Sequence, residues 1–153
     1  MAENSFSERL AGFFAEFGTG RTMVLSTSAG GRVSSRMTSV ILMNGKFCFQ
    51  TDTELRKYSQ LKENPHAALC IDNIQIEGIC TEKGHPFAFP AFCEVFEKRF
   101  EGSYRAYSGL TNERLFELDP TYIERWVYKQ GVPYIETFDI INGSYSFKQY
   151  RGR

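Results

Sequence analysis

The sequence holds few of the residues from which metal centres and disulfide scaffolds are built. Its 153 residues include two histidines and four cysteines. The cysteines (Cys48, Cys70, Cys80 and Cys93) form no C-x-x-C pair, and no Cys, His or acidic cluster has the spacing of metal ligands. We therefore predict no metal site, and we expect buried, reduced thiols, as in a cytoplasmic protein.

Net charge and long apolar runs are also missing. The 18 Lys and Arg residues are balanced by 18 Asp and Glu residues. A chain without excess positive charge lacks the broad electrostatic footprint with which proteins bind nucleic acid or anionic lipid. The polar N-terminus does not resemble a signal peptide, and no uncharged run is long enough to span a membrane. We expect neither a nucleic-acid nor a membrane partner, and any anion site must be local.

What is present predicts one domain over residues 1–153, with an N-terminal helix within 1–20 and a polar, mildly basic tail over 142–153. Ser5-x-x-Glu8 resembles a capping box, followed by phenylalanines at helical spacing. A second helix is expected after Asp52 or Thr53, ending at Asn64-Pro65, and an aromatic helix over 91–107. Strands are predicted over 23–27, 32–42, 46–51, 66–71, 74–81, 115–129 and 134–140.

Short turns join most of these strands. Gly30-Gly31 and Gly131 mark two turns, and Asn44-Gly45 is the strongest short hairpin signal in the chain. Hairpin connections require antiparallel pairing. The sequence therefore predicts a mainly β (α+β) fold, an antiparallel barrel with flanking helices.

The hairpin around Asn44-Gly45 brings chemically active residues together. With a two-residue turn, Met43 faces Lys46, and continued pairing places Thr38 opposite Thr51. Side chains two apart on a strand share a face, so Arg36 lies with these threonines at the open end of the hairpin.

A helix expected directly after Thr51 carries Arg56 and Lys57 in its first turns. A helix N-terminus offers free N–H groups and a positive dipole end. Together with Arg36 and the Thr51 hydroxyl, these groups would form a phosphate cradle. The alternative is that the three cations are ordinary solvated surface charges.

Three segments in this order resemble the FMN-binding core of the pyridoxamine 5′-phosphate oxidase-like split-barrel family. They are Arg36-Met-Thr-Ser-Val-Ile41, Phe49-Gln-Thr51 and Arg56-Lys57. The stretch Asp72 to Gly78 resembles the family's next element. The resemblance covers about residues 22–83 well and 120–139 more loosely, and the short general stress protein-like and flavin reductase-like members are the nearer comparison.

The resemblance implies a six- to seven-stranded antiparallel split β-barrel with Greek-key topology, working as a homodimer with the flavin at the interface. It implies FMN as cofactor, with a deazaflavin or haem as alternatives. In the family's pattern Arg36, Thr51, Arg56 and Lys57 would hold the phosphate. The residues expected at the ribityl chain and ring are Met37, Thr38, Ser39, Gln50, Asn73 and Gln75.

Two departures from the family separate this chain from the vitamin-making oxidases. Ile41 stands where those members carry Lys, and their Arg-rich, Trp-containing C-terminal segment is replaced by Tyr145 to Arg153. We therefore expect an FMN-dependent oxidoreductase of unassigned substrate, acting with a small-molecule electron donor and acceptor and with no assigned catalytic side chain. The alternative is a non-catalytic flavin store or sensor.

Three further features stay open between structural and functional interpretations. His85 lies in a Gly-His-Pro loop that is able to approach a ligand, whereas His66 begins a strand. Trp126 fits the core or a dimer interface, and in the resembling family its segment lies near the flavin. The basic tail is either solvated or extends into the site of a partner subunit.

Overall fold

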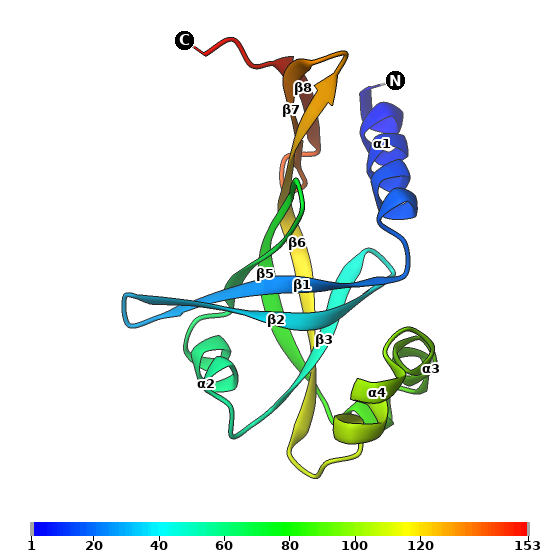
Figure 1. Cartoon of the computed structure of the whole chain (residues 1–153), viewed down its shortest axis with the longest axis vertical. Coiled ribbons are helices and arrows are strands. Elements are labelled where there is room, and N and C mark those ends of the chain that lie inside the picture. The colour runs from blue at the N-terminus through cyan, green and yellow to red at the C-terminus, as the bar shows by residue number, and fades with distance from the viewer. Residues whose placement is uncertain (1, 153) are drawn as a thin grey trace.

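The computed structural model describes residues 2–152, which form one eight-stranded antiparallel sheet with helices around it (Figure 1). The strands are β1 Gly20–Ala29, β2 Arg32–Met43, β3 Lys46–Asp52, β4 His66–Ile71, β5 Ile74–Gly84, β6 Glu113–Lys129, β7 Val132–Asp139 and β8 Ser144–Gln149. The helices are α1 Ala2–Phe17, α2 Arg56–Glu63, α3 Pro90–Arg99 and α4 Glu101–Ser103, with a 3₁₀ turn η1 Pro86–Ala88 and a π-helical segment η2 Tyr104–Ser108.

The first six strands close into a barrel. The strand order is β3-β2-β1-β4-β5-β6, and pairing of β3 with β6 completes the ring. After the β1-β2-β3 meander the chain returns through α2 and places β4 beside β1, which is a Greek key. The expected mainly β, antiparallel barrel with Greek-key topology is confirmed. Strands β7 and β8 continue the sheet beyond the barrel (Figure 1).

Strand β6 serves both parts of the sheet. Its first half pairs with β3 and its second half with β7, while β5 follows it on the other side. Pro120 lies between the two halves, opposite a bulge at Gly78. A Cβ atom on Gly78 would clash with the carbonyl oxygen of Asp119, so only glycine fits there. The strand predicted through Asp119-Pro120 is thereby confirmed.

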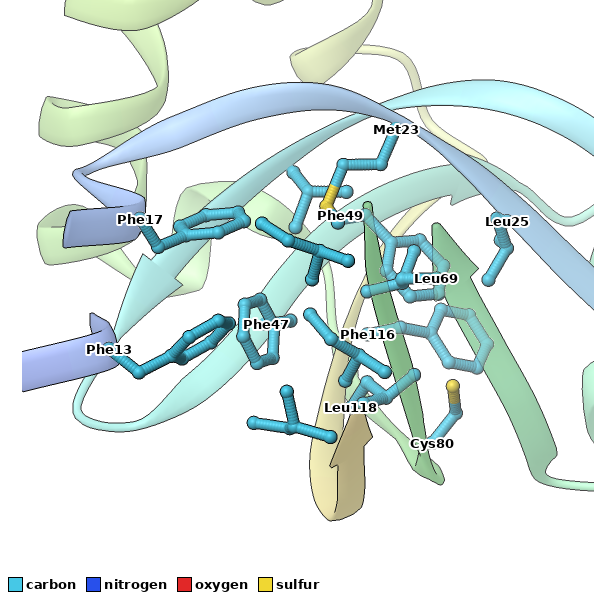
Figure 2. Packing of buried hydrophobic residues seen from close by; sticks show 14 of the residues in the cluster. Phe13, Phe17, Met23, Leu25, Phe47, Phe49, Leu69, Cys80, Phe116 and Leu118 are labelled. Carbon is cyan, nitrogen blue, oxygen red and sulfur yellow. The ribbon is translucent and has the colours of Figure 1, made fainter. Parts of the chain in front are cut away.

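Aromatic side chains fill the barrel and join α1 to it. Phe13 and Phe17 of α1 lie against Phe47 of β3, and Figure 2 shows these rings together. Deeper in the barrel, Phe49 and Phe116 stack with ring centroids 5.7 Å apart. The abundance of phenylalanine is therefore largely accounted for by the core.

The predicted N-caps of the first two helices are both wrong. Helix α1 begins at Ala2, so Ser5 lies inside the helix, where its hydroxyl accepts a hydrogen bond from Arg9 rather than capping. Helix α2 begins at Arg56 after Leu55, which provides no side-chain cap. The Asp52 carboxylate instead accepts a hydrogen bond from the backbone N–H of Glu54, closing a turn before the helix.

The segment expected as one aromatic helix over 91–107 is divided into three. Helix α3 ends at Arg99, the non-helical backbone of Phe100 interrupts the segment, and α4 and η2 follow. The tail over 142–153 also contains a strand that was not predicted, β8, which pairs with β7. Its Phe147 ring stacks on Tyr134 at 4.8 Å, so alternating aromatics were the overlooked signal.

The cysteines agree only in part with the expectation of buried thiols. All four are unpaired; Cys48 and Cys80 are buried, Cys93 is half-buried, and Cys70 is exposed on β4. The expectation of a buried thiol is wrong for Cys70, because this residue lies on the outward face of its strand. None of the helices within residues 2–152 is both long and apolar enough to cross a membrane.

Candidate functional site

A cavity of about 400 Å³ lies where β2 and β3 diverge. This size lies within the range of small-molecule and cofactor pockets. The walls come from β2, β3, the loop into α2, the α3–η2 segment and the start of β6. The lining residues are Met37, Thr38, Ser39, Gln50, Thr51, Asp52, Glu54, Leu55, Lys57, Phe96, Ser103, Tyr107, Leu110 and Glu113.

The cavity exists because the β2–β3 hairpin opens early. The expected pairing of Met43 with Lys46 is confirmed, but the ladder ends at Ile41 and Cys48. The expected pairing of Thr38 with Thr51 is wrong, because the β2–β3 ladder stops after three pairs; on its other edge β3 pairs with β6, where Thr51 is opposite Arg114. Both threonines are buried and line the same cavity from separate walls.

Six of the ten expected ligand contacts line this cavity. They are Met37, Thr38, Ser39, Gln50, Thr51 and Lys57. The Gln50 side chain accepts a 2.7 Å hydrogen bond from Ser108, which is fully buried. This bond joins η2 to the barrel and keeps the helical wall of the cavity in place.

Three of the four expected phosphate contacts form a cluster of positive charge beside the cavity. Arg36 donates hydrogen bonds to the Thr27 hydroxyl at 2.8 Å and to the side-chain amide oxygen of Gln60 at 3.0 Å. Both of these partners are neutral. Arg56 donates to the hydroxyl of Ser34 at 2.9 Å.

Two of these cations, Arg36 and Lys57, have pKa values that are lowered in part by a neighbouring positive charge. Burial, and then the charge of Arg56, lowers the pKa of Arg36. Burial also lowers the pKa of Lys57, and Arg36 adds to that effect. Within residues 2–152, none of these three cations forms an ion pair with a carboxylate.

The start of α2 adds backbone donors to this cluster. Arg56 and Lys57 are the first two residues of the helix, and Leu55 leaves the N-terminus without a side-chain cap. Unpaired N–H groups at a helix N-terminus carry partial positive charge and bind anions. The late helix start therefore places the dipole end nearer to Lys57 than the sequence indicated.

Sequence reasoning missed the acidic lining of the cavity. Asp52, Glu54 and Glu113 lie on its walls with Lys57. Glu113 is only 4% exposed, and no hydrogen bond or ion pair of its carboxylate is found among residues 2–152. Burial, and then the neighbouring Asp52, raises the pKa of Glu113 to about 7, against a smaller opposing effect of Lys57. The sequence predicted that this strand begins at Leu115, so Glu113 lay outside the predicted element. Residues two apart on a strand share a face, and the position of Glu113 two residues before Leu115 was therefore the signal that could have placed it on the strand.

The helical wall was missed as well. Phe96, Ser103, Tyr107 and Leu110 all come from the segment between β5 and β6. Its π-helical turn is a rare conformation that is frequent at functional sites. Nothing in the aromatic pattern separated these residues from core positions.

Asn73 and Gln75 lie away from this cavity in the folded chain. They are at the opposite end of β5 from Gly84, which pairs with Leu115 near the cavity. Gln75 and Gly84 are nine positions apart along the strand, a span of roughly 30 Å. The Asn73 amide donates to the Trp126 carbonyl at 2.7 Å, and Gln75 contacts Glu124 at 3.5 Å. Their contact with a ligand stays a prediction.

The two histidines contribute no ligand to the cavity lining. His85 forms a 2.9 Å hydrogen bond with the Leu110 carbonyl and accepts one from the Phe87 N–H, so it positions the loop that ends at the cavity. His66 begins β4, as expected. Among residues 2–152, no group of three or more His, Cys, Asp or Glu side chains is arranged to hold a metal ion.

Comparison with known proteins agrees with this architecture. The family model described as pyridoxamine 5′-phosphate oxidase matches residues 10–127. None of the curated proteins matches the chain significantly.

Solved structures show the same fold at low identity. General stress protein 26 from Bacillus anthracis str. Sterne is 18% identical with a TM-score of 0.57, covering 76% of this chain and 89% of its own. An FMN-binding, pyridoxamine 5′-phosphate oxidase-related protein from Nostoc punctiforme PCC 73102 is 16% identical with a TM-score of 0.61, covering 86% and 88%. The heme storage protein HutZ from Vibrio cholerae is 17% identical with a TM-score of 0.57, covering 65% and 80%.

Proposed function

The chain belongs to the pyridoxamine 5′-phosphate oxidase family, and from that premise we propose that it is an FMN-binding flavoprotein. The flavin would lie in the cavity between β2, β3, α2 and the α3–η2 segment. The FMN-binding protein from Nostoc punctiforme supports this choice, because it shares the fold over most of both chains.

One observation carries the proposal, the cluster of Arg36, Arg56 and Lys57 at the uncapped start of α2. Three neighbouring cations without carboxylate partners repel one another; after burial, this repulsion is the second cause that lowers the pKa of Arg36 and that of Lys57. A phosphate monoester removes that repulsion, and it accepts charge-assisted hydrogen bonds from all three side chains and from backbone N–H groups. The Thr51 hydroxyl is buried at the same end of the cavity and adds a neutral donor.

The rest of the cavity suits a flavin's polyol chain and ring. Thr38, Ser39 and Gln50 offer polar groups along one wall, while Phe96 and Leu55 offer apolar surface. When bound, the flavin supplies hydride and electron transfer, and the protein supplies placement and electrostatics. We propose that this protein is an FMN-dependent oxidoreductase with a small-molecule electron donor and acceptor. Its four unpaired cysteines support a reducing, cytoplasmic compartment.

The environment of Ile41 supports a reaction other than pyridoxamine 5′-phosphate oxidation. Ile41 is fully buried and packs with Phe92, Phe96 and Leu115 in a second apolar cluster. It takes the place of a lysine in the vitamin-making members, so no cation reaches the cavity from this position.

We also propose that the protein is a homodimer whose second copy covers the cavity mouth. Four residues that line the cavity are large, apolar and exposed to solvent. Their exposed fractions are 60% for Met37, 54% for Tyr107, 50% for Leu55 and 46% for Leu110. Exposed apolar clusters of this kind mark interaction surfaces. Asn73 and Gln75, distant from the cavity of their own subunit, would contact the ligand only from a second copy.

A non-catalytic binding protein is the second candidate, favoured by the shared fold of HutZ, a heme storage protein. Haem binding in such proteins commonly uses an axial His, Cys, Met or Tyr. Among the described residues the lining of this cavity contains no histidine or cysteine; Met37 and Tyr107 are the candidate axial ligands there, and the neighbouring cations favour a phosphate-bearing ligand. A flavin store, or a deazaflavin with the same phosphate and ring framework, is the closer alternative.

The phosphate cradle predicts a difference between two flavins. Lys57→Ala and Arg36→Ala each remove a charge-assisted hydrogen bond to phosphate, so each should weaken FMN by about 10- to 100-fold and riboflavin by much less. Quenching of flavin fluorescence on titration measures both dissociation constants. Arg32→Ala, which changes another exposed cation of β2, is the matched control and should leave both affinities unchanged. Equal losses for FMN and riboflavin would place the phosphate elsewhere.

Reduction kinetics distinguish an oxidoreductase from a store. In stopped-flow mixing of the FMN-loaded protein with NADH or NADPH, bleaching of the flavin band at about 450 nm should be faster than for free FMN. A band that persists with both nucleotides, and with other hydride and electron donors, would favour storage. In that case the substitutions of Lys57 and Arg36 should still weaken FMN more than riboflavin.

The proposed homodimer predicts the mass of the protein in solution and a substitution that should weaken the association of its two copies. Light scattering should give twice the 17.5 kDa of one chain. Leu55→Asp, which charges the apolar mouth at a position where aspartate suits a helix N-cap, should shift the protein toward monomer without unfolding it. Ile141→Asp, on the exposed loop between β7 and β8, is the control and should remain dimeric. A wild-type monomer at micromolar concentration would contradict this proposal.

A further inference from the structure

Glu113 is the one acidic side chain of the cavity that is more than nine-tenths buried and has no partner among the described residues. It begins β6 directly opposite Asp52 of β3, so the strand register forces two carboxylates together at the end of the cavity nearest α2. The neighbouring negative charge of Asp52 disfavours ionisation of Glu113. Burial of the residue also disfavours the charged form of Glu113, and protonation relieves that cost.

The groups around Glu113 give it little compensation. Charged or titratable side chains reach this end of the cavity from four elements and from the loop before α2: Asp52 of β3, Glu54 of the loop, Lys57 of α2, Arg36 of β2 and Tyr107 of η2. Among the described residues, Lys57 is the cation that lowers the pKa of Glu113. Its effect is smaller than the increase caused by burial and by Asp52. Arg114, next along β6, is turned away and pairs with Glu82 of β5.

A phosphate on the cradle would bring further negative charge to the same end of the cavity. Lys57 lines the cavity and acts on Glu113, so one cation is shared between the carboxylate and the incoming anion. When phosphate takes Lys57 as its partner, the ionised form of Glu113 loses its single favourable neighbour and gains a repulsive one.

We propose that Glu113 holds a proton whenever a phosphate-bearing ligand occupies this cavity, so that ligand binding and proton uptake are coupled. This inference rests on the proposed FMN site and makes Glu113 a specificity-determining residue for it. A neutral carboxyl group donates a hydrogen bond, whereas the ionised group only accepts and repels phosphate. The cavity therefore selects phosphate-bearing ligands most strongly when Glu113 is protonated.

The sign of the pH dependence follows from linkage. The free cavity loses the Glu113 proton near pH 7, in accordance with the raised pKa of this group, and the phosphate-bound cavity keeps it to higher pH. Above that pKa, binding must take up a proton, so affinity falls as pH rises. Below it the proton is already present and affinity is independent of this group.

The test compares FMN and riboflavin with the wild-type protein and Glu113→Gln between about pH 6 and pH 8. The wild-type dissociation constant for FMN should rise about tenfold over this range, one pH unit of proton linkage above the pKa. Glu113→Gln keeps a neutral donor, so its affinity for FMN should only rise by roughly twofold over this range, as the phosphate itself loses its second proton at about pH 6. It should therefore bind FMN about tenfold more tightly than the wild type at the upper pH, a gain that misfolding does not produce.

Two controls separate the possible outcomes. Glu117→Gln changes another acid of β6 that pairs outward with Lys46 and Lys83, and it should retain the wild-type pH profile. Riboflavin should show little pH dependence with any of the proteins. Identical FMN profiles for the wild type and Glu113→Gln, or an equal pH dependence for riboflavin, would overturn the proton coupling and leave the flavin site intact. Failure of FMN to bind the wild type at any pH would instead overturn the proposed function.

Discussion

The cavity depends on how strand β3 lies between two neighbouring strands. Along one edge β3 pairs with β2 for only three residue pairs after the Asn44-Gly45 turn, and along its other edge it pairs with β6 from Phe47 to Asp52. The pairing with β6 closes the barrel, whereas the short ladder to β2 leaves the far ends of β2 and β3 apart. Thr38 and Thr51, which a longer ladder would pair, line the cavity from separate walls.

Charge is distributed unevenly around the space between β2 and β3. The cations gather where β2 approaches the start of α2, and the acids come from the end of β3 and the start of β6. Lys57 belongs to both groups, because its pKa responds to Arg36 and to Glu113. The protein as a whole is neutral, so its capacity for an anion comes from this local separation and not from net charge.

The sequence predicted the features that depend on near neighbours. The turn at Asn44-Gly45, where both residues have positive φ, and the strand pairs beside it follow from turn chemistry alone. The grouping of Thr51 and Lys57 followed from strand and helix order. The pairing of β3 with β6 was hidden, because it is a contact between residues more than sixty positions apart. Glu113 was missed for the same reason, since its environment is made by Asp52 and Lys57.

Helix boundaries were a different kind of failure. Asp52 and Thr53 are good N-cap residues, yet the Asp52 carboxylate closes a turn with Glu54 and the helix starts at Arg56. Both uses of aspartate satisfy a backbone N–H, and local sequence does not decide between them. The outcome strengthens the site, because it brings an uncapped N-terminus next to Lys57.

The central claim is that the cations at the start of α2 hold the phosphate of a flavin nucleotide as a dianion. Phosphorus NMR of FMN bound to the protein tests this directly, because the chemical shift reports the second ionisation of the phosphate, which occurs at about pH 6 for a free monoester. A phosphate held by Arg36, Arg56 and Lys57 should keep the dianion shift well below that pH. A bound phosphate that titrates like free FMN would show that these cations do not hold it.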